Sequence, residues 1–237
     1  MEFSNSLQRW YLQNKRDLPW RNTVNPYPIW LSEIMLQQTR VAQGLPYFIA
    51  FTESFPTVLD LAKADEEQVL KLWQGLGYYS RARNMHKTAQ IIAFELEGNF
   101  PNNYKELLKL KGIGEYTAAA IASFAFNEVV PVVDGNVFRV LSRYFDIETD
   151  IASSGAKKEF TGIANKLIPS DNPALFNQAI MEFGALQCIP KNPNCSTCIF
   201  KDSCAALQKK KVAELPVKLK KTKVTNRYFN YLIFLDN

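Results

Sequence analysis

The four cysteines of the chain lie close together, within a stretch of 17 residues. They follow the spacing Cys-x6-Cys-x2-Cys-x5-Cys, and no cysteine occurs elsewhere among the 237 residues. Grouped thiolates are soft ligands that suit zinc or an iron–sulfur cluster. Pro190 and Pro193 favour a loop between the first two of them. The four residues are Cys188, Cys195, Cys198 and Cys204.

Three interpretations of this cysteine group compete. Two disulfides are disfavoured, because the chain begins with an acidic and polar segment that does not resemble a secretion signal. A four-cysteine zinc site stays open, although such sites often pair two short Cys-x2-Cys knuckles and only one is present. A [4Fe–4S] cluster accepts unequal loops around a larger cube, so the spacing favours a cluster over zinc.

A second motif, Leu110-Lys111-Gly112-Ile113-Gly114, separates two segments with helical periodicity. Two glycines one residue apart allow a tight turn and a close backbone approach. The helix that follows would begin with unpaired amides and the positive end of its dipole, which suits a phosphate. By itself the motif is also typical of an ordinary corner between helices. Together with the downstream cysteines, it indicates an anion-binding hairpin.

Two carboxylates lie in apolar surroundings where they could transfer a proton or stabilise a cation. Glu33 interrupts the apolar segment 29–36, where loss of water would raise its pKa and keep it protonated. Asp134 follows the apolar run 129–133 and precedes Gly135. Taken alone, the pattern favours simpler roles, an exposed helix charge for Glu33 and a helix N-cap for Asp134.

Helices must position these groups, because apolar residues recur every three to four positions along most of the chain. The sequence predicts an all-α body of about ten helices. The last segment, 228–235, is rich in aromatic and branched residues and predicts a short strand without a partner strand. The clearest helical segments are 29–41, 58–62, 68–73, 82–96, 104–110, 116–126, 137–144, 157–167 and 174–186.

Composition and charge narrow the classes of function. The net charge of +5 suits a polyphosphate partner, although the lysines between 209 and 223 are also typical of a solvated linker. No apolar run reaches the ~18 residues of a membrane span. We therefore expect a cytoplasmic, nucleoid-associated protein that does not enter the membrane. His86, the single histidine, has no partner at metal-ligand spacing and is interpreted as structural.

In combination, these motifs resemble the endonuclease III and MutY superfamily of base-excision DNA glycosylases. The hairpin, the segment 133–140 and the cysteine loop occur in the order of that superfamily. Three segments nearer the amino terminus are similar to the MutY branch. They read Leu18-Pro19-Trp20-Arg21, Ser32-Glu33-Ile34-Met35-Leu36-Gln37-Gln38-Thr39 and Gly75-Leu76-Gly77-Tyr78-Tyr79-Ser80-Arg81-Ala82-Arg83-Asn84.

The resemblance implies two helical lobes that flank a DNA cleft. Residues 22–126 would form a six-helix lobe with the helix-hairpin-helix, and residues 1–21 and 127–211 would form an iron–sulfur cluster lobe. Residues 212–237 would be a linker and the start of a truncated C-terminal domain. MutY proteins usually continue into a β-containing domain that helps to recognise 8-oxoguanine, and this chain ends about where that domain would begin.

The resemblance also implies catalytic roles. Glu33 would donate a proton to adenine, and Asp134 would stabilise the cationic sugar and help to deliver water. Tyr116 occupies the place of the lysine that forms a Schiff base in strand-cutting relatives, so a strand-cutting reaction is not expected. Asn136 would orient the aspartate or a DNA phosphate.

Further residues are implied in DNA recognition. The adenine must leave the base stack before it reaches the active site. The adenine pocket would be lined by Arg16, Trp20 and Arg21; lesion reading and intercalation would use Gln38, Thr39, Leu76 and Tyr78; and the DNA backbone would contact Lys111, Gly112, Ile113, Gly114, Arg81 and Arg83.

The function that follows is a monofunctional adenine DNA glycosylase. It would hydrolyse the N-glycosidic bond of adenine opposite 8-oxoguanine or guanine in double-stranded DNA and leave an abasic site, acting as a monomer. A [4Fe–4S] cluster would be held by Cys188, Cys195, Cys198 and Cys204, and a monovalent cation would bind at the hairpin. The alternatives are a catalytically silent DNA-binding module of the same fold and, less favoured, a zinc-bearing helical adaptor.

Overall fold

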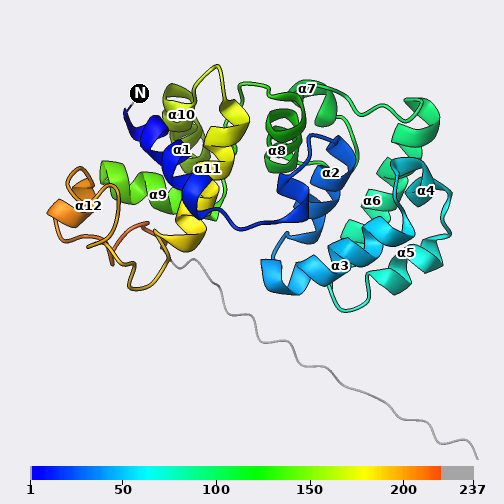
Figure 1. Cartoon of the computed structure of the whole chain (residues 1–237), viewed down its shortest axis with the longest axis horizontal. Helices are drawn as coiled ribbons and strands as arrows, with labels where there is room; N and C mark the ends of the chain where they lie inside the picture. The colour runs from blue at the N-terminus through cyan, green and yellow to red at the C-terminus, as the bar shows by residue number, and fades with distance from the viewer. Residues whose placement is uncertain (1, 220–237) are drawn as a thin grey trace, which may run out of the picture.

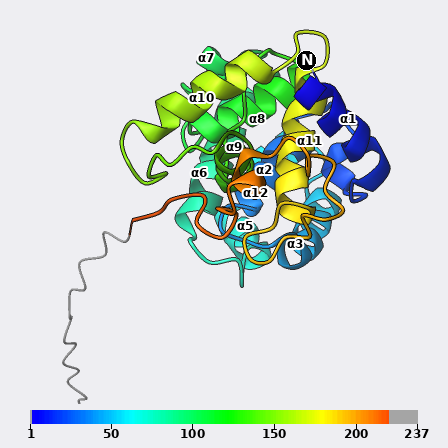
Figure 2. The same ribbon diagram turned by 90° about the vertical axis from the view of Figure 1, so that its left-hand side faces the viewer.

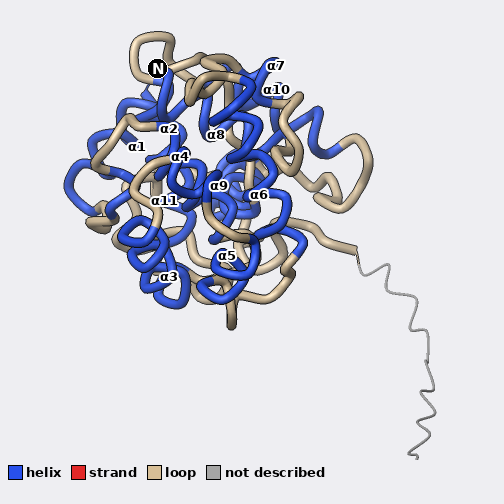
Figure 3. The backbone as a smooth tube through the Cα atoms, turned by 90° about the vertical axis from the view of Figure 1, so that its right-hand side faces the viewer, coloured by secondary structure: helices blue, strands red, loops and turns tan. Residues whose placement is uncertain are grey.

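The computed structural model describes residues 2–219 of the chain. Within these residues every regular element is helical, and Figure 3 shows helices joined by loops without a strand, which confirms the all-α prediction. The strand predicted at 228–235 lies outside the described residues. The elements are α1 (Glu2–Asn14), η1 (Pro19–Arg21), α2 (Pro26–Met35), α3 (Val41–Ser54), α4 (Val58–Lys63), α5 (Glu66–Leu72), α6 (Ser80–Gln90), η2 (Ile91–Glu95), α7 (Tyr104–Leu107), α8 (Glu115–Phe126), α9 (Gly135–Phe145), α10 (Ala156–Leu167), α11 (Pro173–Leu186) and α12 (Ala205–Gln208).

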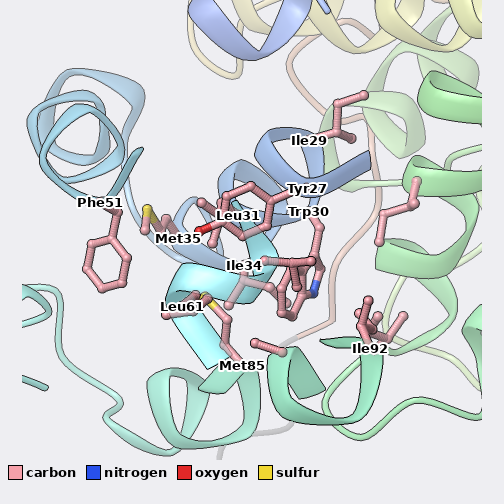
Figure 4. Packing of buried hydrophobic residues seen from close by; sticks show 14 of the residues in the cluster. Tyr27, Ile29, Trp30, Leu31, Ile34, Met35, Phe51, Leu61, Met85 and Ile92 are labelled. Carbon is pink, nitrogen blue, oxygen red and sulfur yellow. The ribbon is translucent and has the colours of Figure 1, made fainter. Parts of the chain in front are cut away.

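The described residues pack around two large apolar cores. The first lies among α2 to α8 and contains the fully buried Trp30 and Trp73. Figure 4 shows Trp30 and Ile34 of α2 packed in this core with Met85 and Ile92. The second core joins α1 to α9, α10 and α11, and the two groups of helices lie at opposite ends of the molecule in Figure 1. Burial of this apolar surface is the main stabilising contribution to both.

The amino-terminal segment belongs to both halves of the fold. Helix α1 lies against α11, as Figure 2 shows, and the Tyr11 hydroxyl donates to Gln178 Oε1 at 2.6 Å. The chain then crosses over, so that Leu18 and Trp20 pack into the first core. These two residues fall inside the 1–21 segment that the sequence assigned to the cluster lobe.

Helix ends follow local sequence signals. Asn25 caps α2 by accepting from the Tyr27 amide at 3.0 Å, and Pro26 occupies the first turn, where its missing amide costs nothing. The prediction of one continuous helix over 29–41 is wrong. Helix α2 ends at Met35, and Gln38 adopts a left-handed backbone with φ of 58° before α3 begins.

The predicted helix-hairpin-helix joins α7 to α8 beside α6. Gly112 has φ of +78°, and a Cβ atom built there would approach Asn84 Cβ to 2.9 Å. The Thr88 hydroxyl donates to the Lys111 carbonyl at 2.5 Å. Only glycine satisfies both the conformation and the close approach at position 112.

No helix in the described part of the chain is long and apolar enough to cross a membrane.

Candidate active site

One cavity brings together groups from both halves of the molecule. Helices α2 and α8 of the first half, and α9 and α11 of the second, all contribute side chains to its lining. Seven of the residues that the sequence assigned to catalysis or to adenine binding line it, with Thr39 from the set assigned to lesion reading. They are Glu33, Tyr116, Asp134, Asn136, Arg16, Trp20 and Arg21.

Glu33 is one of the carboxyl groups that line this cavity. It lies on α2, whose neighbouring residues Ser32, Ile34 and Met35 are buried. Burial raises the pKa of the Glu33 carboxyl from 4.5 to about 7, even though a hydrogen bond from the Tyr116 hydroxyl opposes the increase. Near neutral pH a large fraction of Glu33 therefore holds a proton that it can donate.

Tyr116 is the next side chain in the cavity, in the first turn of α8 after the hairpin. Burial and the neighbouring Glu33 carboxylate raise the pKa of its phenol well above 10. The hydroxyl therefore keeps its proton at any physiological pH. It can donate a hydrogen bond to Glu33 or present its oxygen to a cation, but it cannot form a Schiff base.

Asp134 lines the same cavity, at the N-cap of α9. Its Oδ1 accepts from the amides of Asn136 and Val137, both at 2.8 Å, and its Oδ2 accepts from Asn136 Nδ2 at 2.7 Å. Burial raises the pKa of Asp134, and these three hydrogen bonds counteract the increase. The N-cap role expected from the sequence alone and the site role are thus compatible, because the cap fixes the carboxylate in the cavity.

The side chain of Asn136 is itself held from behind. Arg139 Nη2 donates to Asn136 Oδ1 at 2.8 Å and to the Gly184 carbonyl at 2.6 Å, while Arg139 Nε donates to the Cys188 carbonyl at 2.7 Å. A Cβ atom at Gly184 would approach Asn136 Cβ to 2.7 Å. The sequence reasoning missed Arg139 and Gly184. A buried arginine one turn into the helix that Asp134 caps is the signal that could have found the first.

A buried ion-pair cluster forms another wall of the cavity. Glu182 of α11 is fully buried and accepts from Arg16 Nη2 at 2.6 Å and from Arg21 Nη2 at 2.7 Å. Burial alone would raise the pKa of Glu182, but the hydrogen bonds from the two arginines outweigh it and lower the pKa to about 2. Glu182 is a second omission of the sequence reasoning, although a carboxylate inside the apolar segment 174–186 was visible.

Trp20 fits two of the sequence interpretations at once. It lines the cavity, and only 8% of its surface is exposed. Its ring meets the Phe48 ring edge-on, with 4.9 Å between centroids. The side chain is therefore part of the core and also a wall of the cavity.

The residues assigned to lesion reading occupy two turns. Gln38 is exposed, and 66% of Tyr78 is exposed, whereas Leu76 is buried. Gln38 and Tyr78 both have left-handed backbones, with φ of 58° and 48°. A non-glycine residue rarely adopts this conformation unless its surroundings hold it there.

The residues assigned to the DNA backbone differ among themselves. Lys111, Gly112 and Gly114 are exposed on the hairpin, whereas the Ile113 side chain is buried in the first core. Arg83 is exposed and pairs with Glu66 at 3.2 Å. Arg81 is partly buried and donates to main-chain carbonyls of its own chain.

The four cysteines line one pocket beside α9 and α11. Its other walls include the apolar Val140, Phe183 and Phe200. Two polar hydrogens point at the sulfurs, from Arg143 Nη1 to Cys188 Sγ at 3.5 Å and from the Phe200 amide to Cys198 Sγ at 3.4 Å. Among residues 2–219, no three His, Cys, Asp or Glu side chains are close enough to share a single metal ion.

The helix-hairpin-helix, the two carboxylates and the cavity between two helical lobes define a class, the helix-hairpin-helix DNA glycosylase fold. The chain belongs to the HhH-GPD superfamily of base excision DNA repair proteins, whose model matches residues 31–166. The matched part contains Glu33, Tyr116 and Asp134.

Several curated relatives share much of the sequence. The chain is 40% identical over 220 residues to the adenine DNA glycosylase of Buchnera aphidicola subsp. Schizaphis graminum, with 92% of this chain covered. It is 44% identical over 216 residues to the human adenine DNA glycosylase, with 87% of this chain and 40% of the human protein covered. The chain spans about 63% of the length of the Buchnera relative.

Solved structures resemble the fold. A thermostable thymine-DNA glycosylase has a TM-score of 0.80 and 29% identity, with 87% of this chain and 95% of that chain covered. Endonuclease III in a non-covalent DNA complex has a TM-score of 0.73 at 23% identity, with 88% and 95% covered. The similarity to endonuclease III concerns the fold alone.

Proposed function

We propose that this chain is a monofunctional adenine DNA glycosylase, which removes adenine opposite 8-oxoguanine or guanine and leaves an abasic site. The observation that carries the proposal is the placement of Glu33, Tyr116 and Asp134 in one cavity. The relatives named adenine DNA glycosylase support the choice of base. Double-stranded DNA is the proposed partner, the chain acts as a monomer, and the nucleoid is its expected location.

The first step is the departure of the base. Glu33 donates its proton to a ring nitrogen of adenine, and the electron pair of the N-glycosidic bond leaves with the base. A Glu33 pKa of about 7 keeps that proton available at neutral pH without holding it too tightly. The sugar becomes an oxocarbenium-like cation.

The second step is capture of the cation by water. The Asp134 carboxylate faces the cationic sugar and accepts a proton from the attacking water. Its three hydrogen bonds to the start of α9 keep it oriented and favour its charged form. The Tyr116 oxygen adds a further partial negative charge. The two carboxyls divide the work because burial raises the pKa of Glu33 to about 7, while hydrogen bonds counteract the increase at Asp134.

The rest of the cavity holds the extruded base. Glu182 fixes the guanidinium groups of Arg16 and Arg21 against one wall, and Trp20 supplies an apolar face for stacking. The exposed hairpin residues Lys111 and Gly114 and the exposed Arg83 contact DNA phosphates. A monovalent cation bound at the hairpin would also contact a DNA phosphate.

We infer that the four cysteines hold a [4Fe–4S] cluster. All four cysteines line one largely apolar pocket, and their unequal spacing would suit the larger cube of a cluster better than a single zinc ion. The cluster would order the loop around Cys188 to Cys204.

Release of free base is the decisive test. The purified chain is incubated under single-turnover conditions with a duplex that contains adenine opposite 8-oxoguanine, and the abasic product is revealed with hot alkali. We expect release by the wild type and release slower by about 10²- to 10⁴-fold by Glu33→Gln, which should still bind the duplex. A chain that binds the duplex without releasing adenine would instead be a silent DNA-binding module.

A further inference from the structure

Two exposed turns carry the residues that are proposed to meet the DNA bases. The first, residues 36–40, contains Gln38, and the second, residues 75–79, contains Tyr78. Both residues have left-handed backbones, with φ of 58° and 48°. Such conformations persist only when neighbouring groups over-determine them, so something in the structure must hold both turns.

Arg81 makes hydrogen bonds to both turns. Its Nη1 donates to the carbonyls of Ile34 at 2.9 Å, Met35 at 3.3 Å and Gln37 at 2.7 Å. Its Nη2 donates to the carbonyls of Leu76 at 3.1 Å and Gly77 at 3.3 Å. One guanidinium group therefore joins two turns that are separated by about forty residues in sequence. A charged donor strengthens each of these bonds.

Aromatic rings fix the guanidinium group from its sides. It lies 5.2 Å from the ring of the fully buried Trp73 and 5.7 Å from the ring of Tyr78. Trp73 Nε1 also donates to the Gly77 carbonyl at 3.0 Å. Arg81 lies in the first turn of α6, where the helix dipole disfavours a positive charge. The carbonyls and rings must therefore account for its position.

These contacts leave Arg81 little capacity for a phosphate. Both terminal nitrogens already donate to carbonyls, and the remaining Nε is buried without a partner among the described residues. Arg83, two residues further along α6, is exposed and is the better candidate for a phosphate contact.

We propose that Arg81 is a positioning residue that locks the Gln38 turn to the Tyr78 turn, so that both approach a base pair as one rigid unit. This proposal rests on the proposed glycosylase function for its consequence in catalysis. The lock also reaches the active site, because the Gln37 side chain donates to the Thr117 hydroxyl at 3.4 Å, directly beside Tyr116.

The test compares Arg81→Lys with two other variants on α6. Lysine keeps the charge, but a single ammonium cannot reach the carbonyls of both turns. Arg83→Ala shows how the loss of a phosphate contact changes the salt dependence of DNA affinity. Lys87→Arg alters an exposed side chain outside the site and is the neutral control. Each is measured for duplex affinity between low and moderate salt and for single-turnover adenine release.

For Arg81→Lys we expect adenine release to fall by about 100-fold, the effect of misplacing groups by about 1 Å. Its affinity for an undamaged duplex and the salt dependence of that affinity should match the wild type. Arg83→Ala should reduce the slope of log affinity against log salt by about 0.9. A normal release rate in Arg81→Lys would show that a positive charge alone suffices at this position, as it would for a phosphate contact, and would overturn the proposal.

Hydrogen exchange on the free protein tests the lock without DNA. The Thr39 amide donates to the Leu36 carbonyl at 3.2 Å, and the Leu76 amide donates to the Trp73 carbonyl at 3.1 Å, one in each turn. In the wild type the two amides should exchange with equal opening free energies and equal responses to denaturant, and Arg81→Lys should lose protection at both. Independent exchange in the wild type would refute the lock, even if the variant does not fold. If the wild type released no adenine, the proposed function would fail while this measurement still decided the lock.

Discussion

Replacing Glu33 by glutamine should stabilise the protein at alkaline pH while it greatly slows adenine release. Burial raises the pKa of Glu33 from 4.5 to about 7 in the folded state. Each pKa unit corresponds to ~1.4 kcal/mol, so ionised Glu33 costs the folded state about 3 kcal/mol above pH 7. The folded state binds more protons than the unfolded chain between these pKa values, so stability falls as pH rises from 4.5 through about 7.

Glutamine keeps the shape of the side chain and carries no charge at any pH. The free energy of unfolding of Glu33→Gln should therefore exceed that of the wild type by about 3 kcal/mol more at pH 8 than at pH 4.5. For a chain of this length that equals a relative Tm gain of about 10 °C. Chemical denaturation of both proteins at the two pH values measures the difference. Glu53→Gln, which changes an exposed glutamate of α3, is the matched control and should show no such divergence.

The same substitution removes the proton donor. Adenine release should fall by about 10²- to 10⁴-fold, the usual contribution of a positioned acid, while duplex binding persists. An equal stability difference at both pH values would show that Glu33 is not desolvated. Near-normal release would show that another group protonates the base.

Four more outcomes follow from the site. Wild-type adenine release under single-turnover conditions should fall as pH rises through about 7, where Glu33 loses its proton, and a rate that is flat between pH 6 and 8 would contradict this assignment. The DNA product should remain an unbroken abasic strand until alkali treatment, and efficient borohydride trapping of a covalent complex would contradict the role of Tyr116. Gly184→Ala should reduce release by about tenfold or more without loss of duplex binding, because a Cβ there would press on Asn136 at 2.7 Å; normal kinetics would show that the helix yields freely. Cys198→Ser should give a protein without broad visible absorbance and with weakened DNA binding, and a coloured variant with four irons would contradict the ligand assignment.

Local sequence patterns predicted those features of the fold that depend on residues close together in the chain. The helical periodicity and the helix-hairpin-helix are properties of single segments, and both are present in the structure. The break after Met35 was missed, because the apolar pattern continues through a turn that only the left-handed Gln38 reveals. Helices α1 and α3 were also not predicted, although in α1 Phe3, Leu7 and Tyr11 recur at helical spacing and are buried in the second core.

What the sequence could not supply are contacts between distant segments. Glu182 lies 166 residues from Arg16 and still accepts two bonds from its guanidinium group. The interpretation of Arg81 as a phosphate ligand came from the resemblance to the MutY branch. The carbonyls that it contacts lie up to 47 residues away and carry no sequence signature. Every residue carries the same main-chain carbonyl, so the sequence does not indicate which carbonyls accept hydrogen bonds from Arg81.

The proposed catalysis requires that the two cores be joined firmly, because Glu33 belongs to the first half and Asp134 caps a helix of the second. The joining segment, which runs from the end of α8 to Asp134, contains no regular structure of its own. One buried side chain fixes it: Asn177 of α11 accepts from the Val132 amide at 3.0 Å and donates to the Val130 carbonyl and to Ser123 Oγ, both at 2.8 Å. These bonds satisfy polar groups that burial would otherwise leave unpaired. They also bring the end of α8, the joining segment and α11 to one point. Asn177, which does not line the cavity, therefore helps to hold the half that carries Glu33 against the half that carries Asp134.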